Sequence, residues 1–310
     1  MNLQQRPQDL CIIGSANVDT TLRLEHLPRP GETILALRKS VRAGGKGANQ
    51  AVAAAALGGA VTFLSCVGQD PEGVFLMQVL EARGVSVANV RVEGEVATGT
   101  ATILVDHGGE NVIVVDQGAN AHVNAKDVET FLGVASPTVV MSQLEIGLDA
   151  VLAAAEGSKG IFILNPAPMT TNATDLAEIL KLTDILVPNR AELGRLADTQ
   201  TPVTISDVDH CVAGLDFGGQ VIVTLGSDGV AVYASGTSGI RSLIPSIKVE
   251  SVDTSGAGDA FCGALGQGLA AGLDLLTAVT HANRFAAWST TIHGAQIVGY
   301  APLDSPQAVG

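Results

Sequence analysis

Short apolar runs alternate along most of the chain with longer segments of helical periodicity. The apolar runs are typical of buried strands and lie at Leu10–Ile13, Val61–Val67, Pro137–Met141, Ile161–Leu164, Ile185–Val187 and Val221–Leu225. Helices are predicted between and after them, at Gly47–Leu57, Glu72–Arg83, Asp149–Glu156, Gly258–Ala271 and Leu275–Ile292. Continuous apolar strands that alternate with helices indicate an α/β fold, with a mostly parallel sheet covered on both faces.

Two segments interrupt this alternation, because no helix separates them from their neighbours. Ile34–Lys39 is predicted to be extended, and Thr100–Val115 is predicted to be a hairpin that turns at His107-Gly108-Gly109. Val112–Val115 is apolar without alternation, so we expect both of its faces to be covered, one over a ligand and the other on a second subunit. These strands are predicted to form a small separate sheet; an ordinary edge of the main sheet is the alternative.

The composition excludes several classes of partner. The chain has 310 residues, 31 acidic and 17 basic side chains, and a formal net charge of −14, which disfavours binding to nucleic acid or to an anionic membrane surface. The uncharged stretch Gly47–Gln69 is rich in alanine and interrupted by Gly58-Gly59, so it predicts a buried helix, a turn and a strand, not a membrane span.

Met1–Asp9 lacks the apolar core of a signal peptide, and the four cysteines are scattered without metal-ligand spacing. We therefore expect a cytoplasmic protein with reduced thiols.

The strongest chemical motif runs from Asp253 to Phe261, with the sequence Asp-Thr-Ser-Gly-Ala-Gly-Asp-Ala-Phe, and leads into a long apolar helix. Its two glycines allow a tight turn that exposes successive amides, so the N-terminus of the helix is predicted to bind an anion. Asp259 lies beside this anion hole, where a carboxylate can take the proton of a hydroxyl that attacks a phosphoryl group. An acidic residue in this position can equally serve only to stabilise the helix, and the motif alone leaves both interpretations open.

Four further motifs follow strands or precede helices, and the first of them follows the first strand, where open α/β sheets bind ligands. They are Gly14–Asp19, Ala43–Gln50, Val187–Glu192 and Thr224–Gly229. The first offers polar groups for a polyol, and the second joins flexible glycines to a cation and an amide without the Ser or Thr of a Walker loop. The third also fits a capping box, and the fourth also fits a simple turn between strands. The chain lacks a strand-linked GxGxxG sequence, which disfavours a nicotinamide-dependent dehydrogenase.

In this order and at this spacing the motifs resemble the ribokinase family of sugar kinases, the phosphofructokinase-B type, from about Asp9 to Ala301. The resemblance also includes Gly109-Glu110-Asn111-Val112-Ile113, Gly118-Ala119-Asn120, Gln143-Leu144-Glu145, Asn165-Pro166-Ala167-Pro168 and Gly294-Ala295-Gln296. It implies a ribokinase-like three-layer sandwich, with residues 1–310 as one kinase domain whose lid strands come from about 17–41 and 98–116. It further implies a homodimer formed through the lid and a reaction that uses ATP, Mg²⁺ and an activating K⁺. The acceptor it implies is D-ribose, phosphorylated at its 5-hydroxyl.

The roles of single residues follow from the same resemblance. Asp259 is expected to be the catalytic base, and the amides of Ser255, Gly256, Ala257 and Gly258 are expected to hold the transferring phosphoryl group. The sugar hydroxyls are expected to contact Asn17, Asp19, Gly44, Gly45, Lys46, Gly47, Asn49 and Glu145. The nucleotide is expected to contact Asn189, Thr224, Leu225, Gly226, Ser227, Asp228, Gly229 and Asn283.

The implied metal ligands form two groups. Glu192 is expected to hold Mg²⁺ through water. The K⁺ ligands are expected to be Asp253, Ser255, Ser289, Ile292, Gly294 and Val298. The chain departs from the family after Gln296, where Ile297-Val298 stands in place of the usual proline and serine.

Other functions remain compatible with the motifs. A kinase of the same fold can have another acceptor, such as deoxyribose, a ketohexose or a nucleoside, although the 3% aromatic content offers few rings to hold a nucleoside base. A sugar- or nucleotide-binding regulator without catalysis is the alternative from another class. Such a protein would be expected to have lost Asp259 or the neighbouring glycines, and all of them are present.

Overall fold

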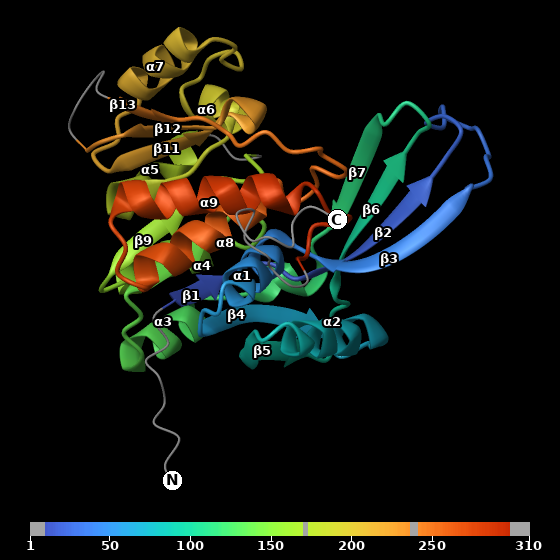
Figure 1. The fold of residues 1–310 in the computed structure, drawn as a ribbon. Helices are drawn as coiled ribbons and strands as arrows, with labels where there is room; N and C mark the ends of the chain where they lie inside the picture. Colours follow the sequence, from blue (N-terminus) through green and yellow to red (C-terminus); the bar gives the residue numbers. More distant parts are fainter. Residues whose placement is uncertain (1–9, 170–172, 236–240, 298–310) are drawn as a thin grey trace.

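The fold was analysed in a computed structural model, which describes residues 10–169, 173–235 and 241–297 (Figure 1). Within these ranges, nine strands form the central sheet in the order β13-β12-β11-β10-β9-β8-β1-β4-β5. They are β1 (Leu10–Ile13), β4 (Val61–Gly68), β5 (Ser86–Glu93), β8 (Val139–Ser142), β9 (Ile161–Leu164), β10 (Ile185–Leu186), β11 (Gln220–Thr224), β12 (Val230–Tyr233) and β13 (Arg241–Ile244). Neighbours from β5 to β11 are parallel, and β12 and β13 add antiparallel pairs at one edge.

Helices pack on both faces of this sheet and complete three layers. One face carries α1 (Lys46–Ala56), α2 (Pro71–Ala82), α8 (Ala257–Ala270) and α9 (Leu275–Ser289). The other carries α3 (Ala125–Val134), α4 (Leu148–Gly157) and α5 (Ala177–Leu182), while α6 (Arg190–Leu196) and α7 (Ile205–Gly214) pack beside β11 and β12. The side chains of β1 show why both faces are apolar: Leu10 and Ile12 enter one core, and Cys11 and Ile13 enter the other.

Four strands form a second, smaller sheet that projects from the body (Figure 1). Its order is β3-β2-β6-β7, with β2 (Asn17–Arg23), β3 (Arg38–Gly44), β6 (Gly99–Val105) and β7 (Asn111–Asp116). The prediction of a separate small sheet is confirmed. We refer to these four strands as the lid sheet.

One prediction about the lid sheet is wrong in detail. The first extended segment is not Ile34–Lys39, because residues 34–37 lie outside any strand and β3 begins at Arg38, opposite the end of β2 at Arg23. Apolar side chains suggested the earlier start, but Leu35 and Leu37 are exposed. The side chains of Val112–Val115 are between 44% and 61% exposed in the single chain, so their cover by a ligand and by a second subunit stays a prediction.

Other boundaries differ where exposed positions break the pattern. The last helix ends at Ser289 and not at Ile292, because Thr290–Ile292 forms turns. The strands β5, β12 and β13 and the helices α3, α5 and α7 were not predicted, since they lie at sheet edges, are short, or mix buried with exposed residues. The helix α6 begins at the capping box that the motif Val187–Glu192 predicted. The stretch Gly47–Gln69 forms α1 and β4, and no helix among the described residues is long and apolar enough to cross a membrane.

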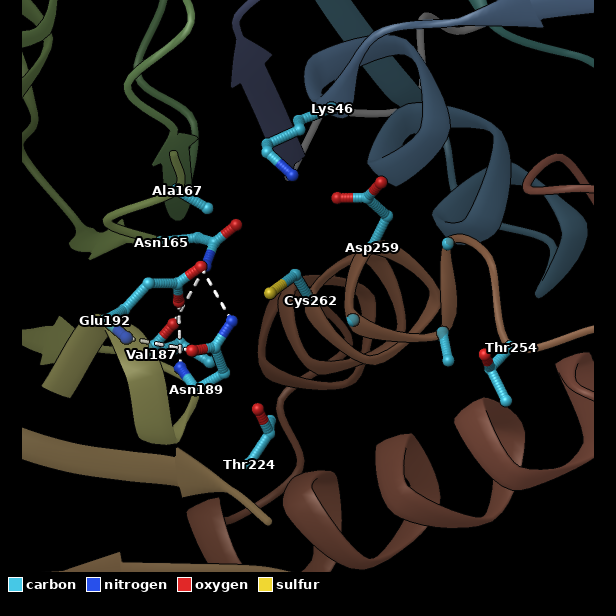
Figure 2. A pocket seen from close by; sticks show the side chains of 13 residues that line it. Lys46, Asn165, Ala167, Val187, Asn189, Glu192, Thr224, Thr254, Asp259 and Cys262 are labelled. Atoms are coloured by element: carbon cyan, nitrogen blue, oxygen red, sulfur yellow. Dashed lines mark hydrogen bonds between the residues drawn. The ribbon is translucent and has the colours of Figure 1, made fainter. Parts of the chain in front are cut away.

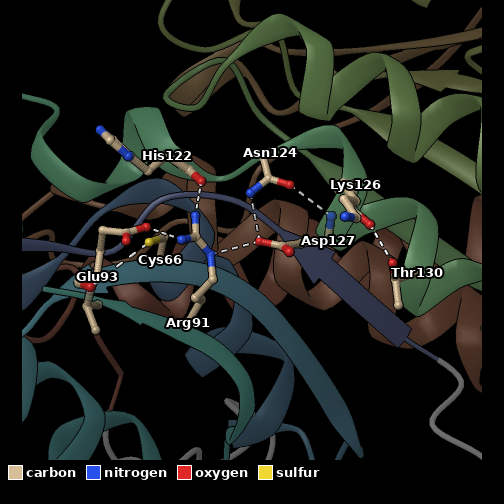
Figure 3. Close-up of polar contacts among 9 residues, drawn as sticks. Cys66, Arg91, Glu93, His122, Asn124, Lys126, Asp127 and Thr130 are labelled. Atoms are coloured by element: carbon tan, nitrogen blue, oxygen red, sulfur yellow. Dashed lines mark hydrogen bonds and ion pairs between the residues drawn. The ribbon is translucent and has the colours of Figure 1, made fainter.

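One arginine joins three elements on the side of the sheet that carries α3 (Figure 3). Arg91 on β5 forms an ion pair with Asp127 in the first turn of α3, with 2.8 Å between Nε and Oδ2, and a second ion pair with Glu93. It also donates a hydrogen bond to the carbonyl of His122, the last residue of the 3₁₀ turn η1 (Gly118–His122). The position of η1 is thereby fixed, and this turn carries Asn120 into the site described below.

The close contact between α1 and α8 gives a prediction of stability. A Cβ atom on Gly263 in α8 would lie 2.3 Å from the backbone oxygen of Gln50 and 2.7 Å from Ala53 Cβ. We expect Gly263→Ala to lower the free energy of unfolding by about 1–3 kcal/mol, because the two helices must separate. Gly133→Ala in α3 is the matched control: its Cβ would meet nothing within 4 Å. It should raise stability by about 0.4–1 kcal/mol. Urea denaturation measures both, and equal effects would contradict the packing argument.

Candidate active site

A cavity of about 220 Å³ lies at the carboxyl ends of the central strands, where open α/β sheets bind ligands (Figure 2). β9, β10 and β11 deliver side chains to one side of it, and the N-terminus of α8 forms the other side. The lining residues are Lys46, Asn165, Ala167, Val187, Asn189, Glu192, Thr224, Thr254, Gly256, Ala257, Gly258, Asp259 and Cys262.

Asp259 is a buried carboxylate on the first turn of α8, 8% exposed. Two side-chain amides from α1 donate to it: Asn49 Nδ2 to Oδ2 at 3.0 Å and Gln50 Nε2 to Oδ1 at 3.1 Å. Burial raises the pKa of Asp259, while the ammonium group of Lys46 and the two amide donors act in the opposite direction. Each carboxylate oxygen keeps a free lone pair, so this side chain is able to accept the proton of a hydroxyl in the cavity.

The turn before α8 is shaped for an anion. Gly256 has a φ of +73°, and a Cβ there would lie 2.6–2.9 Å from Ala295, so only glycine fits. Asp253 fastens this turn to the next loop, because Oδ1 accepts the Ser255 amide and Oδ2 accepts the Gly294 amide, both at 2.9 Å. No described side chain caps the N-terminus of α8. Its first amides and the positive end of the helix dipole are therefore directed at the cavity.

Polar side chains near Asp259 form a second part of the site. Glu145 Oε2 accepts hydrogen bonds from the Lys46 amide at 3.0 Å and from the Ser15 hydroxyl, so the start of α1 is fixed against the segment after β8. Asp19 on β2 lies directly against Gly44, where a Cβ would be 2.0 Å from its Oδ2. Burial, together with the nearby carboxylates Glu145 and Asp259, raises the pKa of Asp19 to about 7.

Two acceptor atoms here are buried and have no hydrogen-bond partner among the described residues. They are Asp19 Oδ1 and Asn49 Oδ1. A buried acceptor without a donor is costly unless a ligand satisfies it, and sugar hydroxyls are donors of the required kind.

Asn17 is held by a neighbouring amide. Asn120 Nδ2 donates to Asn17 Oδ1 at 2.6 Å, and Asn120 Oδ1 accepts the Ala16 amide at 2.8 Å. Gly99, the first residue of β6, leaves the room for this pair, since a Cβ there would lie 2.1 Å from Asn120 Nδ2. The segment Gly14–Asp19 is accordingly not one turn after β1: Asn17 and Asp19 already belong to the lid sheet.

Asn189 and Glu192 form a capping box at the start of α6 and also line the cavity (Figure 2). The Asn189 amide donates to Glu192 Oε2 at 2.8 Å, and the Glu192 amide donates to Asn189 Oδ1 at 2.9 Å. Burial raises the pKa of Glu192. The structural and the functional interpretation of this motif are therefore compatible.

Several residues expected at the nucleotide or the K⁺ lie outside the cavity lining. Gly226, Ser227 and Asp228 form the 3₁₀ turn η3 after Thr224, and Asn283 Nδ2 donates to the Pro245 carbonyl at 2.9 Å. Ser289 Oγ donates to the Ala286 carbonyl within α9. Val298 lies outside the described residues. The nucleotide and K⁺ roles of these residues stay predictions.

Five further residues, Asn165, Ala167, Val187, Thr254 and Cys262, line the cavity without having been predicted as site residues. The first four of them, and Gln50 beside Asp259, were quoted only within their motifs, and Cys262 was not quoted in any. A signal for Asn165 was present, since it is a polar residue directly after a buried apolar strand. Cys262 and Val187 gave no such signal, because apolar residues in these positions look like ordinary core.

The comparisons with known proteins agree with this geometry. Residues 7–300 match the family model described as pfkB family carbohydrate kinase, and the chain belongs to this family. It is 35% identical over 296 residues to the ribokinase of Haemophilus influenzae, covering 93% of this chain and 94% of the relative. It is 36% identical over 301 residues to the ribokinase of Schizosaccharomyces pombe, covering 93% of each.

The fold is the ribokinase fold. The structure of Arabidopsis thaliana ribokinase complexed with ribose and ATP aligns with a TM-score of 0.81 at 30% identity, covering 94% of this chain and 95% of that one. The predictions of the family and of the fold class are thus confirmed. A relative with another acceptor in its name is the deoxyribokinase of Salmonella typhi, 34% identical over 297 residues and covering 93% of this chain and 94% of the relative.

The raised pKa of Asp19 predicts a pH dependence of stability. The folded chain holds a proton on Asp19 up to about pH 7, whereas the unfolded chain loses it near the ordinary value of 3.8. The proton on Asp19 therefore makes its full favourable contribution to the free energy of unfolding below about pH 4, and this contribution is lost as the pH rises toward 7. Asp19→Asn should remove this loss, so the variant should gain stability relative to the native chain between pH 5 and pH 8.

Urea denaturation across that pH range measures the difference. Asp175→Asn, which changes an exposed carboxylate outside the cavity, should follow the native curve. A constant difference between Asp19→Asn and the native chain at every pH would contradict the assignment.

Proposed function

We propose that this chain is a ribokinase, which transfers the γ-phosphoryl group of ATP to the 5-hydroxyl of D-ribose and yields D-ribose 5-phosphate and ADP. The observation that supports this most strongly is the place of Asp259. It is a buried carboxylate held by two amides beside an uncapped helix N-terminus, in a cavity adjoined by buried acceptors. The ribokinases among the relatives, one of them in a structure with ribose and ATP, support the same acceptor.

In the proposed mechanism the protein acts mainly by positioning and by fixed charge. Asn17, Asp19, Lys46 and Glu145 orient the sugar, and Asp259 accepts the proton of the attacking hydroxyl. The amides of Gly256 and Gly258 hold the transferring group, and the dipole of α8 offsets its growing negative charge. The Ser255 and Ala257 amides, which were also expected there, instead donate to Asp253 Oδ1 and to the Thr254 carbonyl. Lys46, which lies near Asp259, Glu145 and Glu192, adds a positive charge to a site that is otherwise acidic.

The residues present also fit the two cations. Among the described residues, no group of three or more His, Cys, Asp or Glu side chains is placed to hold a metal. Mg²⁺ would therefore be held by phosphate oxygens and water, with Glu192 contacting its water shell from the cavity wall. K⁺ would be held by Asp253 and the carbonyls of Ser255, Ile292 and Gly294, a set of oxygen donors on the two loops that Asp253 ties together. Mg²⁺ would supply charge neutralisation of the phosphates.

Location and assembly complete the proposal. We place the enzyme in the cytoplasm, because its four cysteines are free and buried, as expected for reduced thiols. We place a homodimer contact on β7, an edge strand of the lid sheet whose apolar side chains Val112, Ile113, Val114 and Val115 are exposed in the single chain.

An acceptor panel tests the function. ADP release should be fastest with D-ribose, slower with 2-deoxyribose and D-fructose, and lowest with adenosine, each measured in K⁺ and in Na⁺. Asp259→Asn should lower kcat for ribose by about 10²–10⁴-fold while ribose still binds, because general-base assistance is lost. Asp149→Asn is the matched control, since Asp149 is also an acidic residue in the first turn of a helix, α4, but is exposed and outside the cavity.

Near-normal turnover of Asp259→Asn would rule out the base. Ribose binding without ADP release in either salt would favour the non-catalytic regulator instead. Faster turnover of deoxyribose than of ribose would reassign the acceptor and leave the rest of the mechanism in place.

The dimer contact is tested by a charge on β7. Light scattering of the native chain should give about twice 31.5 kDa. Val114→Asp should shift the mass toward the monomer, because a carboxylate would have to be buried in the contact. Val203→Asp, an equally apolar and exposed position outside the lid sheet, should leave the dimer intact. A native monomer with full activity would refute the contact.

A further inference from the structure

Three buried side-chain amides stand in a line behind Asp259, and the mechanism above does not use them. Gln50 from α1 and Gln143 after β8 are fully buried, and Asn165 after β9 is 8% exposed. Gln50 Nε2 donates to Asn165 Oδ1 at 3.2 Å as well as to Asp259 Oδ1 at 3.1 Å. Gln143 Nε2 donates to Gln50 Oε1 at 2.6 Å.

A backbone carbonyl sets the direction of every amide in this line. Asn165 Nδ2 donates to the Val187 carbonyl at 2.9 Å, and a carbonyl can only accept, so Asn165 must turn its oxygen toward Gln50. Gln50 must then present its NH₂ group there, which leaves its oxygen facing Gln143. Gln143 must present its NH₂ group in turn, and its own Oε1 is left buried without a described partner.

The two amides that hold Asp259 consequently differ. Both hydrogens of the Gln50 NH₂ group are committed, one to Asn165 and one to Asp259, and a flip would place its oxygen against two other oxygens. Asn49 donates to Asp259 Oδ2, but its own Oδ1 has no described partner, so nothing comparable fixes its orientation. Gln50 is a fixed donor whether or not a ligand is present, whereas Asn49 is free to adapt to one.

We propose that Gln50 is a positioning residue for Asp259, and that Asn165, anchored on the Val187 carbonyl, locks its amide so that it can only donate to that carboxylate. The inference rests on the proposed role of Asp259 as the base. A locked donor stabilises the charged form of Asp259 against the cost of burial and keeps Oδ1 in one place. This order of the amides leaves Gln143 Oε1 buried without a described hydrogen-bond partner, which is unfavourable. A Cβ on Gly14 would lie 2.1 Å from this oxygen.

Several charged groups face Asp259 and act on it as well. Lys46 lowers its pKa and Glu145 raises it. Among the described residues, the titratable groups that interact with Asp259 are Lys46 on α1, Asp19 on β2, Glu145 after β8, Glu192 on α6 and the thiol of Cys262 on the next turn of α8, whose pKa burial raises. None of them is altered by a change at Gln50, so a shift caused by such a change reports on the amide.

The test follows kcat for D-ribose against pH. Gln50→Leu should lower kcat about tenfold at its plateau, leave KM for ribose nearly unchanged, and move the acid limb upward by about one pH unit. Gln50→Glu, of the same shape, should move it further, because two adjacent carboxylates then share a proton. Asn165→Leu removes the anchor and should move the limb by less than Gln50→Leu. Gln143→Leu, at the far end of the line, should move it least.

A purely structural role predicts a different result. Folded Gln50→Leu and Gln50→Glu proteins, verified by circular dichroism, whose acid limbs match the native one would overturn the proposal. A Gln143→Leu shift larger than that of Asn165→Leu would overturn the direction of the lock.

A second measurement separates this proposal from the proposed function. If the native chain phosphorylates no sugar, the proposed function is wrong. The role of Gln50 is then tested by a double-mutant cycle of Gln50→Leu and Asp259→Asn, in which urea denaturation measures the free energy of unfolding of each variant. The two changes should be more strongly coupled at pH 8 than at pH 5, because the donor amide of Gln50 stabilises the charged form of Asp259, which higher pH favours. If the effects of the two substitutions on the free energy of unfolding are additive at both pH values, the inference about Gln50 is wrong, whatever the enzyme catalyses.

Discussion

The structure depends on placing one carboxylate, Asp259, out of water at the point where α1 and α8 meet. That placement requires donors from α1, and α1 supplies them only because it lies very close to α8. Gly263 permits this closeness in α8, and Gly47 permits the start of α1 to lie against Gly14 and Ser15. The packing of these helices and the chemistry of the site therefore depend on the same distance. If α1 and α8 were far enough apart to accept a methyl group at Gly263, the amides of Asn49 and Gln50 would no longer reach Asp259.

An acidic chain that binds an anionic nucleotide needs a local source of positive potential. With a formal net charge of −14, long-range attraction does not provide it. The structure provides it through the backbone amides of Gly256 and Gly258, the dipole of α8 and the ammonium group of Lys46, the one Lys or Arg among the described residues that line the cavity. These sources act over a few ångströms, so we expect binding to respond more to the shape of the turn than to the total charge of the protein.

Much of this arrangement could be predicted from the sequence, and the remainder could not for identifiable reasons. Buried parallel strands such as Leu10–Ile13 are continuous apolar runs, and the turn before α8 has glycines whose spacing indicates an anion site. The start of β3 was misplaced, because its position depends on pairing with β2 and not on its own apolar residues. The amide line was not visible at all, since Gln50, Gln143 and Asn165 are far apart in the chain and only the sheet order brings them together.

The junction of the two sheets has a mechanical consequence. β2 and β6 leave the body side by side, with Asn17 opposite Gly99, and Asn120 fastens this start to the turn that Arg91 holds. A rotation of the small sheet about that point would sweep Arg23 and Arg38, at its far end, through a wide arc while Asn17 hardly moved. The end of the sheet that carries Asn17 and Asp19, which we propose to contact the sugar, is thus the end next to the fulcrum, and a movement of the far end would hardly change their position relative to Asp259.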